Sequence, residues 1–167
     1  MKIRRIIGID PGYAIVGWGV VDYQGSNFKA VAYGAITTAP DQPFECRLEE
    51  IYNQLCSLLE EYAPQGMGIE KLYFAKNVTT GIDVAGARGV VLLCARKYGL
   101  SIGEYTPMQV KQAVAGYGKA EKNQVMQMTK TLLALPALPK PDDTADALAV
   151  AICHAHSTSS HFPIPLR

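Results

Sequence analysis

The chain has 167 residues, of which 49% are hydrophobic and 19% charged, and its formal net charge is +1. This composition excludes a disordered chain and indicates one globular domain with a substantial core. The sequence has no apolar run of about 18 residues and no signal-peptide pattern, so we expect a cytoplasmic protein without a membrane span.

The near-neutral net charge conceals an uneven distribution of charged residues along the chain. Residues 38–75 carry seven acidic and two basic side chains, a net of −5, whereas residues 76–130 carry eight basic and three acidic ones, a net of +5. A basic half of this kind can bind a polyanion, but it is also typical of an ordinary solvated face. Charge alone therefore leaves the ligand open.

The first part of the chain predicts three strands and a helix. Strand patterns cover residues 3–10, 14–23 and 28–37, with turn residues between them, which indicates an antiparallel meander. Apolar residues at helical spacing then predict an amphipathic helix over 43–63.

The rest of the chain alternates strand and helix. Short strands are predicted at 66–72 and 101–106, and Val125, Met128 and Leu132 are expected to face the core. The predicted helices cover 78–98, 107–115, 121–135 and 142–156.

This order predicts an α/β fold. Its mixed five-stranded sheet joins the meander to parallel strands through helical crossovers, with helices flanking the sheet. We expect residues 1–156 to form one domain and residues 157–167 to form a disordered tail.

A stripe of very small residues runs along the helix predicted at 78–98. Gly81, Ala85 and Gly89 follow one another at intervals of four, although glycine costs a helix about 1 kcal/mol relative to alanine. The stripe could admit a second helix at close range, as in a dimer, or could pack on the sheet. The sequence leaves both readings open.

Four acidic residues stand where a short domain could aim them at one point. Asp10 and Glu70 each end an apolar strand, while Asp143 and Asp146 share one face at the start of the last helix. Divalent metals prefer hard oxygen ligands, and paired metals that act on phosphates need several of them together. The set therefore indicates metal-assisted phosphate chemistry.

Each acid also has an ordinary explanation. Asp10 with Pro11-Gly12 is a common turn opener and also fits the phosphate loop of actin-like ATPases and sugar kinases, which need a second such subdomain. Glu70 could simply face solvent at a strand end. Asp143 and Asp146 could form a helix-capping pair, unless Asp142 is the cap.

Taken together, the motifs are more specific than any one of them. In this order along the chain, they resemble the bacterial RuvC family, the crossover-junction endodeoxyribonucleases with an RNase H-like fold. The matching segments are Gly8-Ile9-Asp10-Pro11-Gly12, Glu70-x-x-Tyr73-Phe74-x-Lys76-Asn77, Ala87-Arg88-Gly89, Val110-Lys111-Gln112, Gly116-Tyr117-Gly118-Lys119-Ala120-Glu121-Lys122 and Asp143-x-x-Asp146-Ala147-Leu148-Ala149.

The resemblance implies roles for particular residues. Asp10, Glu70, Asp143 and Asp146 match the catalytic acids that bind the family's metal ions, expected to be two Mg²⁺ with Mn²⁺ able to substitute. The expected DNA-binding residues are Tyr73, Phe74, Lys76, Lys111, Lys119 and Lys122.

Among these, Lys111 and Lys122 match basic residues used on the DNA backbone near the cut. Tyr73 stands where many relatives carry a phenylalanine that stacks on bases, and it keeps a flat ring. Whether Tyr73 or Phe74 stacks at the junction stays open.

The resemblance also implies a substrate and partners. The substrate would be a four-way DNA junction, cut symmetrically by a homodimer, and a branch-migration complex of a junction-binding protein and a helicase motor would move that junction. Three alternatives remain: a nuclease for RNA–DNA hybrids, a nucleotide-dependent phosphotransferase, and a junction-binding protein without catalysis.

Overall fold

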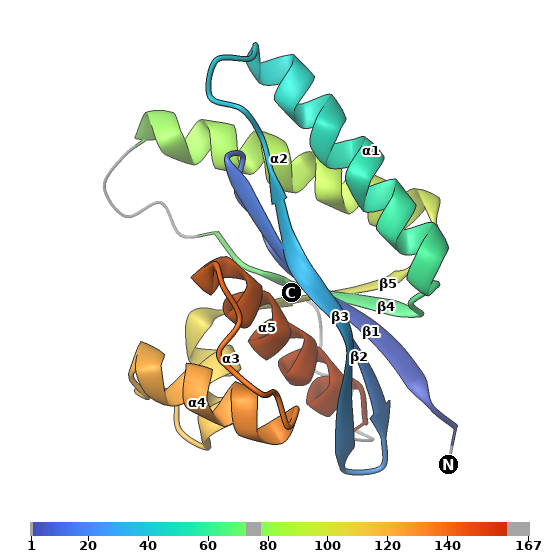
Figure 1. Ribbon diagram of the computed structural model, residues 1–167, viewed down its shortest axis with the longest axis vertical. Helices are drawn as coiled ribbons and strands as arrows, with labels where there is room; N and C mark the ends of the chain where they lie inside the picture. The colour runs from blue at the N-terminus through green and yellow to red at the C-terminus, as the bar shows by residue number, and fades with distance from the viewer. Residues whose placement is uncertain (1, 73–77, 160–167) are drawn as a thin grey trace.

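The computed structural model describes residues 2–72 and 78–159 (Figure 1). Tyr73, Phe74 and Lys76 lie outside the described residues. Within the described part of the chain, no helix is both long and apolar enough to cross a membrane.

A single five-stranded sheet forms the centre of the molecule, in the order β3-β2-β1-β4-β5. Pairing is antiparallel from β1 to β2 and from β2 to β3, and parallel from β1 to β4 and from β4 to β5. The predicted mixed sheet is confirmed. The strands are β1 (Arg4–Asp10), β2 (Ile15–Gln24), β3 (Asn27–Thr37), β4 (Gly66–Glu70) and β5 (Ser101–Tyr105).

Helices cover both faces of the sheet, so the fold has three layers (Figure 1). Helices α1 (Phe44–Tyr62) and α2 (Val78–Lys97) pack on one face, and α3 (Pro107–Ala115), α4 (Lys122–Leu132) and α5 (Asp142–Ser159) pack on the other. Alternating strand residues supply the two cores. In β1, for example, Ile6 belongs to the α5 side while Ile7 belongs to the α1–α2 side.

Several details differ from the sequence-based expectation: β4 ends at Glu70 and α4 ends at Leu132, two and three residues before their predicted ends. The last helix continues to Ser159, three residues beyond its predicted end. Met128 was wrongly assigned to the core, because its side chain is 38% exposed while Met126 and Thr129 are buried. The Thr129 hydroxyl donates to the carbonyl of Val125, which lets a polar residue take the inner position.

An ion pair fastens α2 to the sheet. Arg88 of α2 donates to the carboxylate of Glu104 on β5, and the Arg88 side chain is only 18% exposed. Glu104 is paired in register with Ile69 of β4. The helix is therefore tied to the strand next to the one that ends in Glu70.

Helix α5 lies unusually close to the strands beneath it. A Cβ added to Gly8 would stand 2.0 Å from the carbonyl oxygen of Ala147, and one added to Gly17 would stand 2.0 Å from that of Asp143. Both neighbours are backbone atoms, so glycine is required for this approach. These glycines set the depth at which α5 crosses the sheet.

We expect Gly8→Ala to lower the free energy of unfolding by about 2–4 kcal/mol, because the helix backbone has to move to admit a methyl group. Gly86→Ala is the control, since its Cβ would meet only the far end of the Phe44 ring, at 3.1 Å, and no backbone atom within 4 Å. Urea unfolding of both variants tests the difference. Equal losses would contradict the backbone contact as the cause.

Candidate active site

Asp10 and Glu70 are brought together by parallel strand pairing. They end β1 and β4, and the preceding residues, Ile9 and Ile69, are register partners. Because both strands run the same way, the two carboxylates leave the sheet at one edge. This is the arrangement that the sequence predicted.

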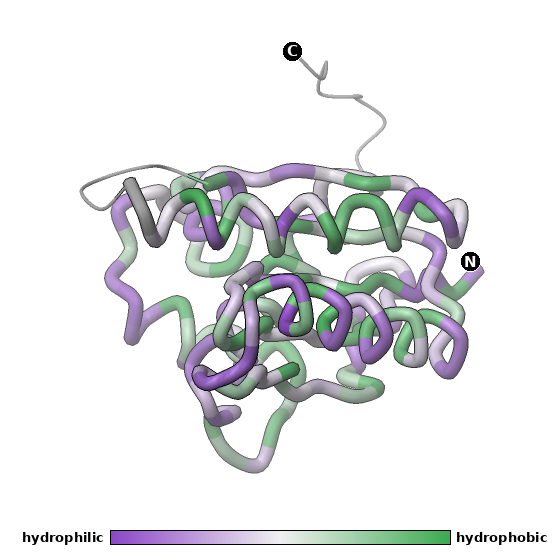
Figure 2. Tube along the Cα trace, turned by 90° about the horizontal axis from the view of Figure 1, so that it is seen from above, coloured by the Kyte–Doolittle hydropathy of each residue, from purple (hydrophilic) through white to green (hydrophobic). Residues whose placement is uncertain are grey.

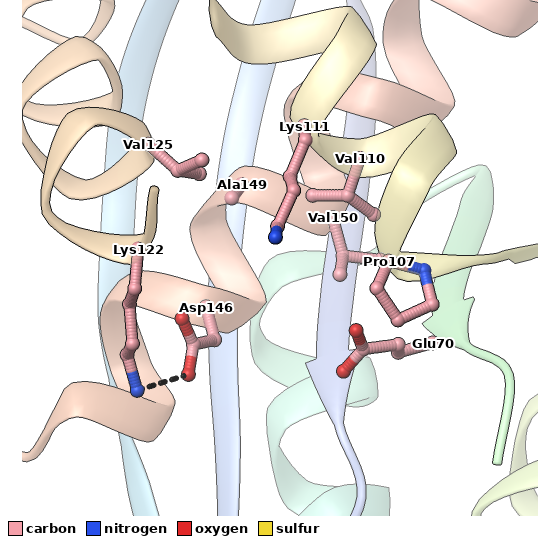
Figure 3. Close-up of a pocket in the computed structure, with 9 residues that line it drawn as sticks. All are labelled: Glu70, Pro107, Val110, Lys111, Lys122, Val125, Asp146, Ala149 and Val150. Carbon is pink, nitrogen blue, oxygen red and sulfur yellow. Dashed lines mark ion pairs between the residues drawn. The ribbon is translucent and has the colours of Figure 1, made fainter. Parts of the chain in front are cut away.

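The start of α5 brings the other two acids to the same edge. The Asp143 backbone lies over Gly17, which is the register partner of Asp10 across the β1–β2 pair. Asp146 lies one turn further along and faces Glu70 across a cavity (Figure 3). Three separate elements therefore supply the acidic cluster of Asp10, Glu70, Asp143 and Asp146.

Burial, together with the crowding of like charges, raises the pKa values of three acids in the cluster. The pKa of Asp10 is raised to about 7, first by burial and then by the negative charges of Glu70, Asp146 and Asp143. Burial and the charge of Asp146 raise the pKa of Glu70. Burial also raises the pKa of Asp146, against the opposing charge of Lys122. The cluster therefore favours a bound cation or proton.

Lys122 places a positive charge next to the acidic cluster. Its ammonium lies 3.3 Å from a carboxylate oxygen of Asp146 and 3.8 Å from one of Asp142. Burial lowers the pKa of Lys122, but the charges of Asp146, Asp142 and Asp10 together raise it. An ammonium held here partly offsets the four acids.

The donor set fits a hard divalent cation, because all four acids offer carboxylate oxygens. In the described residues no three His, Cys, Asp or Glu side chains already stand at metal-ligand spacing.

The predicted DNA-binding lysines occupy different places. Lys111 on α3 and Lys122 on α4 line the cavity beside Glu70 and Asp146, and the Lys111 ammonium points into it (Figure 3). Lys119 is exposed in the turn between these helices. Thus two of the predicted lysines flank the acids.

Sequence reasoning missed Asp142 and the apolar wall of the cavity. Asp142 was considered only as a helix cap, whereas its carboxylate accepts from Lys140 at 3.0 Å and lies near Lys122. Val125 was expected in the core of α4, and Val110 stood out only as part of the Val110-Lys111-Gln112 motif. No sequence signal separates a cavity-lining valine from a fully packed one.

The sheet order, the helical layers and the acidic edge define a protein with an RNase H-like fold. The family profile described as "Crossover junction endodeoxyribonuclease RuvC" matches residues 6–154. The chain therefore belongs to the RuvC family of nucleases.

Relatives cover nearly the whole chain. The crossover junction endodeoxyribonuclease RuvC of Brevibacillus brevis is 58% identical over 151 residues, 90% of this chain and 91% of the relative. That of Ruminiclostridium cellulolyticum is 55% identical over 152 residues, 91% of this chain and 92% of the relative.

Solved structures agree with the fold. The Thermus thermophilus RuvC in complex with Holliday junction substrate has 35% identity and a TM-score of 0.87, over 91% of this chain and 93% of that one. The yeast mitochondrial Holliday junction resolvase Ydc2, at 15% identity and a TM-score of 0.65, shares the fold.

The raised pKa of Asp10 predicts a pH-dependent stability in metal-free protein. Between the unfolded value of 3.8 and the folded value of about 7, only the folded state keeps this proton, so stability falls as pH rises through that window. We expect the free energy of unfolding to drop by about 1–3 kcal/mol across this pH window. Below about pH 4 this loss of stability is absent, and above about pH 7 it has reached its full size.

Urea unfolding of Asp10→Asn in the presence of a chelator checks this. The variant should show a flatter pH dependence and should be more stable than the parent at pH 8. Asp41→Asn makes the same chemical change at an exposed turn and should leave the slope as it is. Parallel curves for all three proteins would contradict the assignment.

Proposed function

We propose that this protein resolves four-way DNA junctions by paired, symmetric nicks in strands of like polarity. The observation that carries the proposal is the convergence of Asp10, Glu70, Asp143 and Asp146 at one sheet edge in a chain of the RuvC family. The Thermus relative, whose structure is described as bound to a Holliday junction substrate, supports this substrate.

Asp10, Glu70, Asp143 and Asp146 would hold two Mg²⁺ ions, with Mn²⁺ able to substitute. When bound, these ions would supply the charge that activates water for in-line attack and stabilises the departing 3′ oxygen. Asp10 has to lose its proton to become a ligand, so protons compete with the metal below about pH 7. Until a DNA phosphate binds, the positive charge of Lys122 would offset the negative charge of Asp146.

The basic side chains beside the cluster would hold the DNA. Lys111 and Lys122 would contact phosphates at the cut, and Lys119 would contact the backbone further out. Tyr73 or Phe74 would stack on bases at the junction, and Lys76 would contact the DNA backbone. The protein would act in DNA recombination and repair in the cytoplasm. A branch-migration complex would move the junction to the position where it is cut.

A two-fold symmetric junction needs two sites, which a homodimer provides. The outer face of α2 suits such a contact, because Ile82 is 64% exposed, Leu93 is 58% exposed and Gly89 has open space where a side chain would be. Figure 2 shows hydrophobic colouring along much of α2, while α1 beside it is more hydrophilic. The open surroundings of Gly89 favour the dimer over packing on the sheet.

The proposal is tested by cleavage of a labelled, movable four-way junction in Mg²⁺, beside a linear duplex and an RNA–DNA hybrid. Paired nicks in the junction alone, rejoined by ligase, are expected. Cutting of the hybrid without a need for a junction would instead support the alternative nuclease.

Asp10→Asn should lower the rate of junction cleavage by at least ~10²-fold while leaving junction binding intact, because it removes one charged ligand and keeps the shape of the side chain. Single-turnover cleavage and gel-shift binding measure the two effects. Asp41→Asn should cut like the parent. Wild-type cutting by Asp10→Asn would rule out the role given to this acid.

Leu93→Glu should convert the dimer into monomers, because it places a charge in the apolar face of α2. Sedimentation velocity over a concentration series measures the change. Met128→Glu is the matched control, since it charges an exposed apolar residue on the opposite side of the sheet. A Leu93→Glu protein that stayed dimeric would place the interface elsewhere.

A further inference from the structure

Two cysteines meet where α1 and α2 pack against each other on one face of the sheet (Figure 1). The sulfur of Cys56, on α1, lies 3.2 Å from the sulfur of Cys94, on α2. A disulfide bond is about 2.0 Å long, so the two sulfurs have to approach by about 1.2 Å to bond. Both residues are free thiols. The pair is therefore placed for a covalent link between the two helices.

The two thiols differ in their access to solvent. Cys56 is half-buried, whereas Cys94 is 0% exposed and belongs to the core between the sheet and the two helices. A redox-sensing pair needs one sulfur that an oxidant can reach and a second sulfur beside it that can close a disulfide. Cys56 meets the first requirement, and Cys94 meets the second.

A positive charge accompanies the pair. Lys97 donates a hydrogen bond to the Tyr52 hydroxyl at 2.7 Å, and its ammonium acts electrostatically on both thiols. Burial, followed by the hydrogen bond with Cys56, raises the pKa of the Cys94 thiol to about 12, and the charge of Lys97 opposes that rise. Reactive cysteines occupy partly exposed positions next to cationic side chains. Cys56 has this setting, while Cys94 keeps its proton until its partner is oxidised.

We propose that Cys56 and Cys94 form a reversible oxidation site, which a hydroperoxide converts from two thiols into a disulfide that links α1 to α2. The Cys56 sulfur attacks the O–O bond of the peroxide, becomes a sulfenic acid and releases water or an alcohol. The Cys94 sulfur then attacks the Cys56 sulfur, and the departing hydroxide leaves as water with the Cys94 proton. The two sulfurs together give up two electrons, which reduce the peroxide. A dithiol reverses the reaction by thiol–disulfide exchange.

This site is separate from the acidic cluster. Helix α2 connects the end of β4 to the start of β5, and these two strands are parallel. The last turn of α2, which holds Cys94, therefore lies toward the edge of the sheet opposite to Glu70. A bond between the cysteines closes a loop that contains β4, and such a bond stabilises a fold by restricting the unfolded chain. The inference does not depend on junction cleavage, so a failure of the proposed function would leave it intact.

The first test identifies the bond. Full-length Cys46→Ser protein, which lacks the exposed cysteine that could join two chains, is reduced, freed of reductant and treated with hydrogen peroxide beside a chelator. Alkylation and peptide mass spectrometry should then show a disulfide between Cys56 and Cys94 in a chain that runs as a monomer on a non-reducing gel. Dithiothreitol should restore both thiols. Two thiols that stay unmodified, or a sulfinic acid at Cys56 beside a free Cys94, would overturn the proposal.

The second test measures what the bond does to the fold. Oxidation should raise the Tm of the parent protein by roughly 5–10 °C, and dithiothreitol should remove the rise. Cys56→Ser should show no rise, because Cys94 has lost its partner, and Cys56→Ala takes its place if the serine variant does not fold. Cys46→Ser makes the same change at an exposed position of the same helix and should rise like the parent. A rise that persists without Cys56, or a disulfide that forms without a rise, would contradict the proposed link.

Discussion

The close contact between α5 and the sheet is the constraint on which the rest of the structure depends. Gly8 and Gly17 let the helix backbone touch the strands, and this contact fixes where the first turn of α5 lies. Asp143 and Asp146 are carried by that turn and therefore come to the edge where Asp10 ends β1. A residue with a side chain at either glycine would lift the helix and separate acids that are far apart in sequence.

The second organising feature is electrostatic. The half-buried carboxylates on neighbouring elements repel one another; burial and this repulsion raise the pKa of Asp10 to about 7, and the ammonium of Lys122 offsets part of their charge. A cation site of this kind is costly to the fold and becomes favourable only on binding. The stable cores on either side of the sheet tolerate this cost because they hold the backbone under the acids in place.

Much of this arrangement could be predicted from local rules. The strand ends at Asp10 and Glu70 were expected to lie together because parallel pairing follows from a helical crossover. The inward face of α4 was predicted only in part: Val125 is buried as expected, but Thr129 takes the inner position given to Met128, because its hydroxyl donates to the carbonyl of Val125 in the folded helix. The cavity was likewise hidden, since its shape results from the spacing of three helices.

The ion pair between Arg88 and Glu104 has a consequence for the proposed dimer. It ties the helix with the exposed apolar face to the strand beside the one that ends in Glu70. Two copies joined through α2 would thus hold their reaction centres at a separation set by a rigid frame of helix, ion pair and sheet. The distance between the two sites would then be fixed by the protein. The more flexible DNA would have to open or bend until two of its phosphates lie that far apart.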